Sequence, residues 1–440
     1  MNREMYDLAA WSMKMALSAG ADECSVGIQK NRFVEISYRE RKPESIKEAS
    51  ERNLNIEIFV NHRYSSQSTS DMRKNALKDF ISKAVATTKL LAEDPFRSLP
   101  DPKYYQGRQN IDLQIVDPKY KQLSPDQRHT MVKTIEQAAF STGSEKVISV
   151  TADQEDSYTE SVELRSNGFE GYRESTIYWA GAEVTVQDEG DRRPNGYNFA
   201  ASVNIHSLPS YEEIGKVAAL RALDLLGAQK IKTETLPVII ENQNVPSLLN
   251  GLLSAMNGRN IQQKQSFLAD KKGQKIASEH LTLIDDPLVV GGLGSKLYDA
   301  DGLAAKKRIM IEAGVLREFY IDWYYSRKLG CEPTTAGTSN LIIPPGKRSV
   351  KEIMKDLGRG IFVTGFIGGN SNSTTGDASV GITGKLFEDG EPVQSVAEMN
   401  IAGNHLEFWH KLSEAANDPW IYSSYRTPSL VFTDVVVSGI

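Results

Sequence analysis

The chain has 440 residues, a net charge of −6 and only two cysteines, Cys24 and Cys331. This charge argues against a general nucleic-acid binder, which carries a basic face, and two distant cysteines form neither a disulfide framework nor a zinc ribbon. The sequence has no run of about 18 apolar residues and no export signal, so we expect a protein of the reducing cytoplasm that does not enter a membrane.

The first 95 residues predict helices that pack on an antiparallel sheet. Apolar residues at helical spacing over 5–16 end at Gly20. Strand alternation follows over 24–38 and 54–60, and a second helical pattern covers 77–91. This order of elements is typical of an α+β unit.

Turn and cap signals divide the next part of the chain. Prolines between residues 94 and 102 predict a loop. Ser124 with Gln127, and Ser210 with Glu213, predict capping boxes at the starts of two helices. Between these helices, Asn167-Gly168 predicts a hairpin and Asn195-Gly196 another turn.

The pattern of predicted elements changes near residue 232. A buried-type strand over 236–240 precedes a short helix, predicted over Pro246–Gly258. Short strands and glycine-rich turns then dominate as far as a last β-branched strand over 429–437. We therefore predict an α+β fold with two domains, a helix-on-antiparallel-sheet domain over 1–232 and a β-rich domain over 233–440.

General catalytic signatures are missing from the sequence. It contains no phosphate-binding loop, no dinucleotide fingerprint and no H-E-x-x-H. His405 and His410 are five residues apart and would not share a helix face, so we predict no metal site there. Cys24 lies in an apolar-alternating strand and is expected to be a core residue. Asp285-Asp286 before Pro287 favours turn capping over catalysis.

A dense polar loop between apolar strands is the strongest remaining candidate. It includes Asn370, Thr375, Gly376 and Asp377. An Asp at such a turn can bind its own backbone, and Gly376 permits a left-handed conformation. Ordinary turn chemistry is therefore favoured over a pocket wall, and the residues by themselves name no reaction.

Several runs in the second domain resemble the PmbA (TldE) branch of the TldD/PmbA peptidase family, over roughly 235–405. These runs are Gln265–Gln274, Leu281–Pro287, Tyr298–Gly302, Ile311–Leu316, Tyr324–Gly330, Gly369–Asp377 and Ile401–Asn404. The resemblance assigns Asn370, Thr375, Gly376, Asp377 and Asn404 to a family-signature loop at a peptide chamber.

The resemblance also implies a cytoplasmic dimer in which zinc belongs to a partner. The active TldD subunit of this family carries an H-E-x-x-x-H helix and a later Cys that bind zinc, and its PmbA/TldE partner lacks them. The helix expected at Pro246–Gly258 has no His, Glu or Cys, and no Cys lies near Tyr425-Arg426. We therefore predict no catalytic, cofactor-binding or metal-binding residue in this chain.

Three functions remain open at this point. The first is a non-catalytic subunit that pairs with a TldD-type partner to degrade unfolded or precursor peptides. The second is a homodimeric peptide-binding or regulatory protein linked to DNA gyrase control, since an older name of the family is "modulator of DNA gyrase". The third is an independent hydrolase that uses the loop from Asn370 to Asp377.

Overall fold

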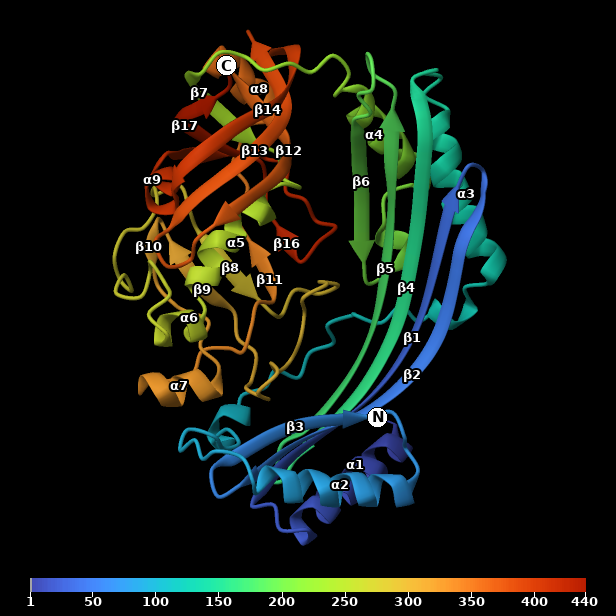
Figure 1. Ribbon diagram of the computed structural model, residues 1–440, viewed down its shortest axis with the longest axis vertical. Helices are drawn as coiled ribbons and strands as arrows, with labels where there is room; N and C mark the ends of the chain where they lie inside the picture. The colour runs from blue at the N-terminus through green and yellow to red at the C-terminus, as the bar shows by residue number, and fades with distance from the viewer. Residues whose placement is uncertain (1) are drawn as a thin grey trace.

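The computed structural model describes residues 2–440 and shows two lobes that face each other (Figure 1). The amino-terminal lobe places helices on a long antiparallel sheet, and the carboxyl-terminal lobe is rich in short strands. The predicted α+β class is therefore confirmed. None of the helices among these residues combines the length and apolar character needed to cross a membrane.

The amino-terminal lobe is built on one six-stranded antiparallel sheet with the strand order β3-β2-β1-β4-β5-β6. Its helices are α1 (Arg3–Ser18), α2 (Lys74–Thr88), α3 (Pro125–Phe140) and α4 (Tyr211–Leu223). Its strands are β1 (Glu23–Arg39), β2 (Lys42–Val60), β3 (Arg63–Thr69), β4 (Val147–Arg165), β5 (Glu170–Val186) and β6 (Asn195–Ser202).

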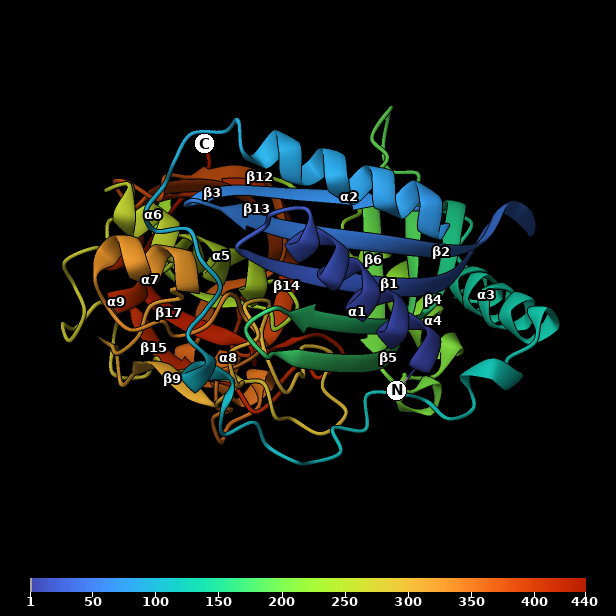
Figure 2. The same cartoon turned by 90° about the horizontal axis from the view of Figure 1, so that it is seen from below.

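Both helix pairs cover the same face of this sheet. On β1, Cys24 and Val26 belong to the core formed with α1 and α2, whereas Val34 and Ile36 belong to the core formed with α3 and α4. These four residues have even numbers, and alternate residues of a strand point to the same side. The core residues of β2, β4, β5 and β6 also have even numbers, so the odd-numbered side chains of these strands and of β1 point away from the helices, toward the second lobe (Figures 1 and 2).

Local signals predicted several of these elements correctly. Ser124 and Gln127 form the capping box of α3, and Ser210 accepts from the backbone N–H of Glu213 at the start of α4. Asn167-Gly168 forms the turn between β4 and β5. The turn predicted at Asn195-Gly196 is wrong, because both residues belong to β6. A Cβ on Gly196 would lie 2.1 Å from the backbone nitrogen of Ala222, so this glycine serves close helix packing.

The carboxyl-terminal lobe combines a six-stranded sheet, β14-β13-β12-β7-β17-β15, with a five-stranded sheet, β10-β9-β8-β11-β16. Its strands are β7 (Glu234–Ile240), β8 (Leu283–Asp286), β9 (Arg308–Glu312), β10 (Val315–Leu316), β11 (Asn340–Ile342), β12 (Arg359–Ser371), β13 (Asp377–Glu388), β14 (Glu391–Asn404), β15 (Leu412–Ala415), β16 (Tyr425–Arg426) and β17 (Leu430–Ser438). Its helices are α5 (Val245–Ala255), α6 (Gly258–Gln262), α7 (Trp323–Leu329), α8 (Val350–Leu357) and α9 (His405–His410).

Strand β7 is buried on both faces, which explains its continuous apolar run. Val238 and Ile240 join the main core, which includes residues of α5, and Ile239 joins the smaller core with α8. The helix after β7 ends earlier than predicted. It stops at Ala255, and Gly258 begins α6 because Asn257 caps that helix through the Arg259 backbone N–H.

Contacts at one end of the molecule hold the two lobes together. The Arg165 guanidinium at the end of β4 donates to the carbonyl oxygens of Ala300 and Asp301 in the second lobe. The loop predicted over 94–102 is also confirmed, and it docks on α7. The Tyr324 hydroxyl donates to Asp94 at 2.6 Å, and the Trp323 indole N–H donates to the Ser98 carbonyl at 3.1 Å.

Candidate functional site

Four of the five family-signature residues form one compact turn. The loop joins β12 to β13, with Gly376 at φ +85°. The Thr375 hydroxyl donates to one carboxylate oxygen of Asp377 at 2.8 Å, and the Asn404 amide donates to the other at 3.1 Å. Asn404 also donates to the Thr375 carbonyl at 3.0 Å. The turn is thus held by its own polar groups.

The fifth signature residue stands apart from this turn. Asn370 lies in β12 opposite Ser379, and its side chain is exposed. Hydrogen bonds from Thr375 and Asn404 hold the pKa of Asp377 below its ordinary value. A carboxylate with a lowered pKa is a weak general base near neutral pH. The geometry agrees with ordinary turn chemistry, and a role of these residues in holding a peptide stays a prediction.

His405, which we considered from the sequence only as a metal ligand, contacts the turn. Its backbone N–H donates to the Gly376 carbonyl at 2.7 Å, and its Nε2 lies 2.8 Å from the Ser371 hydroxyl. The buried imidazole stacks on Phe267, with ring centroids 5.8 Å apart, and burial lowers the pKa of His405. A Cβ on Gly251 of α5 would lie 2.2 Å from Nε2. The histidine therefore joins the turn to α5.

The other candidate residues from the sequence have structural roles: they are buried in a core or bind nearby backbone groups. His410 is exposed, and its Nδ1 donates to the Leu406 carbonyl at 2.6 Å. Cys24 is fully buried, which confirms the prediction of a core residue. Burial raises the pKa of its thiol to about 12. Asp285 accepts from the Ser339 backbone N–H at 3.1 Å and Asp286 from that of Leu288 at 3.0 Å, so both cap backbone groups.

Helix α5 and strand β16, far apart in sequence, meet in the second lobe. The Tyr425 hydroxyl donates to the side-chain oxygen of Asn250 at 3.2 Å. Within residues 2–440, no group of three or more His, Cys, Asp or Glu side chains is placed to hold a metal ion.

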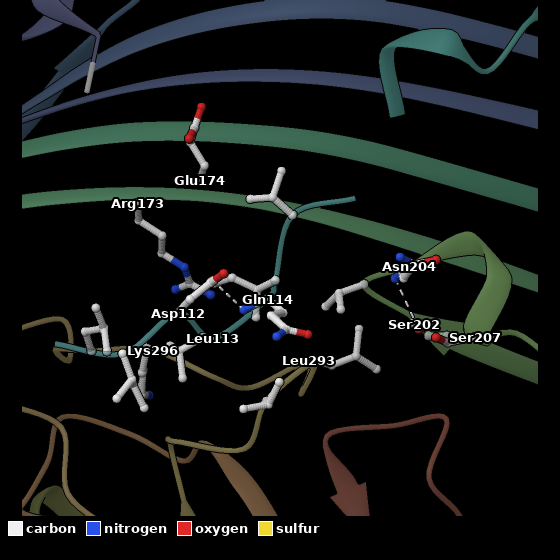
Figure 3. A pocket seen from close by; sticks show the side chains of 18 of the residues that line it. Asp112, Leu113, Gln114, Arg173, Glu174, Ser202, Asn204, Ser207, Leu293 and Lys296 are labelled. Atoms are coloured by element: carbon white, nitrogen blue, oxygen red, sulfur yellow. Dashed lines mark hydrogen bonds between the residues drawn. The ribbon is translucent and has the colours of Figure 1, made fainter. Parts of the chain in front are cut away.

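A cleft of about 920 Å³ lies between the two lobes (Figure 3). Strand β5, the end of β6 and the segment 111–118 form one side, and the loop 290–298 with residues 421–426 forms the other. Three basic side chains line it: Arg173, Lys296 and Arg426.

Family models for three consecutive domains of the PmbA/TldA metallopeptidases match this chain, at residues 24–88, 118–226 and 233–439. The chain belongs to the PmbA/TldD family. A crystal structure from Bacteroides thetaiotaomicron, of a protein whose name connects it with modulation of DNA gyrase, shares 37% identity over 99% of each chain, with a TM-score of 0.96.

Other members of the PmbA/TldD family are more distant but equally complete. The metalloprotease PmbA of Escherichia coli O157:H7 is 27% identical over 98% of this chain and 95% of its own length. TldE from Thermococcus kodakarensis is 24% identical over 99% of this chain and all of its own length. With a TM-score of 0.88 it shows the same fold.

The resemblance to the family places the zinc ligands of an active subunit on the α5 segment and near Tyr425, and here those segments meet. The groups that meet are an amide and a phenol. Zinc sites in proteins use thiolate, imidazole and carboxylate ligands. The residues at the α5–β16 junction therefore do not fit zinc.

Proposed function

We propose that this chain is the non-catalytic subunit of a two-subunit TldD/TldE-type metallopeptidase that acts on unfolded or precursor peptides. The observation that carries the proposal is the α5–β16 junction, where Asn250 and Tyr425 bind each other. The PmbA/TldD fold is kept at this junction, while the ligands that zinc would need are not among the residues present.

The chemistry of peptide hydrolysis supports this assignment. Zinc peptidases lower the pKa of a bound water and polarise the peptide carbonyl. Asn250 and Tyr425 can do neither without a metal. The independent hydrolase that we considered would need Asp377 as a base, and its carboxylate already accepts from Thr375 and Asn404. We therefore place the zinc in a TldD-type partner.

The proposed complex belongs in the cytoplasm. Cys24 is buried and Cys331 is exposed, and both are free thiols. Free thiols are common in reducing compartments, where structural disulfides are rare. A homodimer of this chain is the competing assembly, and it would bind peptides without cleaving them.

Purification with a TldD-type partner from the same genome tests the proposal. We expect the two chains to copurify and to cleave an unfolded peptide that this chain alone leaves intact. The matched control is the partner with the first His of its H-E-x-x-x-H changed to Ala, which should assemble and remain inactive. Recovery of this chain only with itself, with no gain of cleavage on mixing, would overturn the proposal.

A further inference from the structure

The cleft between the lobes carries basic side chains that form no ion pair with an acidic side chain among residues 2–440. Arg173 is an odd-numbered residue of β5, on the sheet face turned away from the helices. Its Nη2 makes one long hydrogen bond, 3.4 Å, to the Ser295 carbonyl. Figure 3 shows Arg173 pointing toward Lys296, while Glu174 points the other way. Burial lowers the pKa of Arg173, and only the nearby Tyr298 hydroxyl opposes that shift.

Lys296 enters the cleft from the opposite lobe. Its Nζ donates to the Thr338 carbonyl at 2.8 Å. Burial lowers the pKa of Lys296, which Asp285 and Asp299 partly offset. Both carboxylates are engaged elsewhere, because Asp285 accepts from the Ser339 backbone and Asp299 from the Leu303 backbone.

Arg426 of β16 completes the set. Its Nε is buried and has no hydrogen-bond partner within residues 2–440. Burial alone lowers the pKa of Arg426, and no carboxylate opposes it. A buried guanidinium donor without an acceptor is costly, and a ligand that supplies the acceptor would remove that cost.

The acidic residues of the cleft are already engaged. Asp112 accepts from the Gln114 backbone N–H at 2.8 Å, and Glu174 accepts from the Tyr158 hydroxyl at 2.5 Å. The cleft thus holds three cations against two occupied carboxylates, in a chain whose net charge is −6. Such a concave positive region attracts anions.

Apolar side chains on the walls of the cleft indicate which kind of anion it binds. Ile111, Val290 and Ile421 line the cleft with exposed fractions of 41%, 55% and 52%. Exposed apolar side chains beside a few convergent polar groups are typical of a ligand site. A polyanion such as a nucleic acid would gain nothing from these apolar walls, whereas a peptide with a carboxylate and apolar side chains would use both.

We propose that this cleft binds a carboxylate of the peptide ligand through Arg173, Lys296 and Arg426, with apolar neighbours of that carboxylate on Ile111, Val290 and Ile421. The inference rests on the proposed function for the peptide nature of the ligand. The carboxylate is either the C-terminus of the peptide or an acidic side chain, and both offer the geometry that a guanidinium binds with two hydrogen bonds.

Three fluorescein-labelled peptides with one apolar sequence test this inference by fluorescence anisotropy on the full chain. One has a free C-terminal carboxylate, one a C-terminal amide, and one the amide with an internal Gln replaced by Glu. We expect one or both acidic peptides to bind at least about tenfold more tightly than the neutral amide. Preference for the first identifies the C-terminus, and preference for the third an acidic side chain.

Variants of two cleft arginines test whether the preference for carboxylate peptides arises in the cleft. Arg426→Gln and Arg173→Gln should each abolish it, whereas Arg193→Gln, at an exposed arginine outside this cleft, should keep it. Circular dichroism checks that each variant is folded. If one cleft variant does not fold, the other still tests the inference. Equal binding of acid and amide peptides, no binding of any peptide, or a preference that survives both cleft variants would overturn the inference.

The two proposals can fail separately. Cleavage by the complex with a TldD-type partner, without any carboxylate preference, would remove the inference and leave the subunit role. A carboxylate preference in the isolated chain, without a recoverable partner, would keep the cleft assignment and remove the subunit role.

Discussion

Asp301 lies where the two lobes meet, in the loop whose carbonyl groups Arg165 binds. One of its carboxyl oxygens accepts from the Trp323 backbone N–H at 2.8 Å. Burial, with a smaller contribution from the neighbouring Asp299 and Asp322, raises the pKa of Asp301 to about 7, and the Trp323 N–H and Arg165 oppose this shift. The folded protein therefore holds a proton here that the unfolded chain would release.

This raised pKa predicts a loss of stability as pH rises from about 4 to about 7. The contribution of Asp301 is fully present below its ordinary pKa of 3.8 and is lost as pH rises through about 7. We expect Asp301→Asn, which keeps the acceptor for Trp323, to reduce the fall in unfolding free energy between about pH 4 and pH 7 by on the order of 4 kcal/mol. Urea unfolding over this pH range measures the effect, and identical pH profiles for both proteins would contradict it.

Residue-level prediction succeeded where the partners are close in sequence. The left-handed Gly376 and the Thr375–Asp377 hydrogen bond depend on neighbours within two residues, and the structure has both. The hydrogen bond from Asn404 to Asp377 joins residues 27 positions apart and was not predicted. The contact between His405 and Ser371 was missed, because it depends on how β12 meets α9 in the folded lobe. No local pattern in the sequence encodes such a contact.

At the scale of elements, α3 and α4 approach so closely that one glycine decides their packing. A Cβ on Gly215 of α4 would lie 2.0 Å from the Ile135 carbonyl oxygen of α3. Backbone atoms cannot move aside as a flexible side chain can. Glycine is otherwise unfavourable in a helix interior. The close approach of α3 explains why glycine occupies position 215.

We expect Gly215→Ala to lower the unfolding free energy by about 1 to 3 kcal/mol, the range for forced overpacking. Gly27→Ala on β1 is the matched control, because a Cβ there meets nothing within 4 Å. Urea denaturation of the two variants measures the difference. A Gly215→Ala protein as stable as the control would show that α4 can shift without cost.

Element starts were predictable from sequence, and element ends less so. Side-chain caps at Ser124 and Ser210 are local and marked α3 and α4 correctly. The predicted Pro246–Gly258 helix ends already at Ala255, because Asn257 caps the next helix, α6, instead of continuing α5. Gly196 was misread as a turn because its role is contact with α4, which is distant in sequence.

At the scale of the whole molecule, the α+β class and the β-rich second part of the chain followed from hydrophobic periodicity. The sequence did not reveal that both helix pairs share one face of a single sheet and leave the other turned toward the second lobe (Figures 1 and 2). For the same reason, Arg173, Lys296 and Arg426 could not be grouped in advance, because they come from opposite sides of the cleft.

We propose that this member of the PmbA/TldD family has no metal chemistry of its own. Zinc content and peptide hydrolysis of the isolated chain, measured after incubation with zinc and removal of unbound metal, test it most directly. We expect zinc far below one ion per chain and no hydrolysis of unfolded peptides. One zinc ion per chain together with hydrolysis that a chelator abolishes would contradict it.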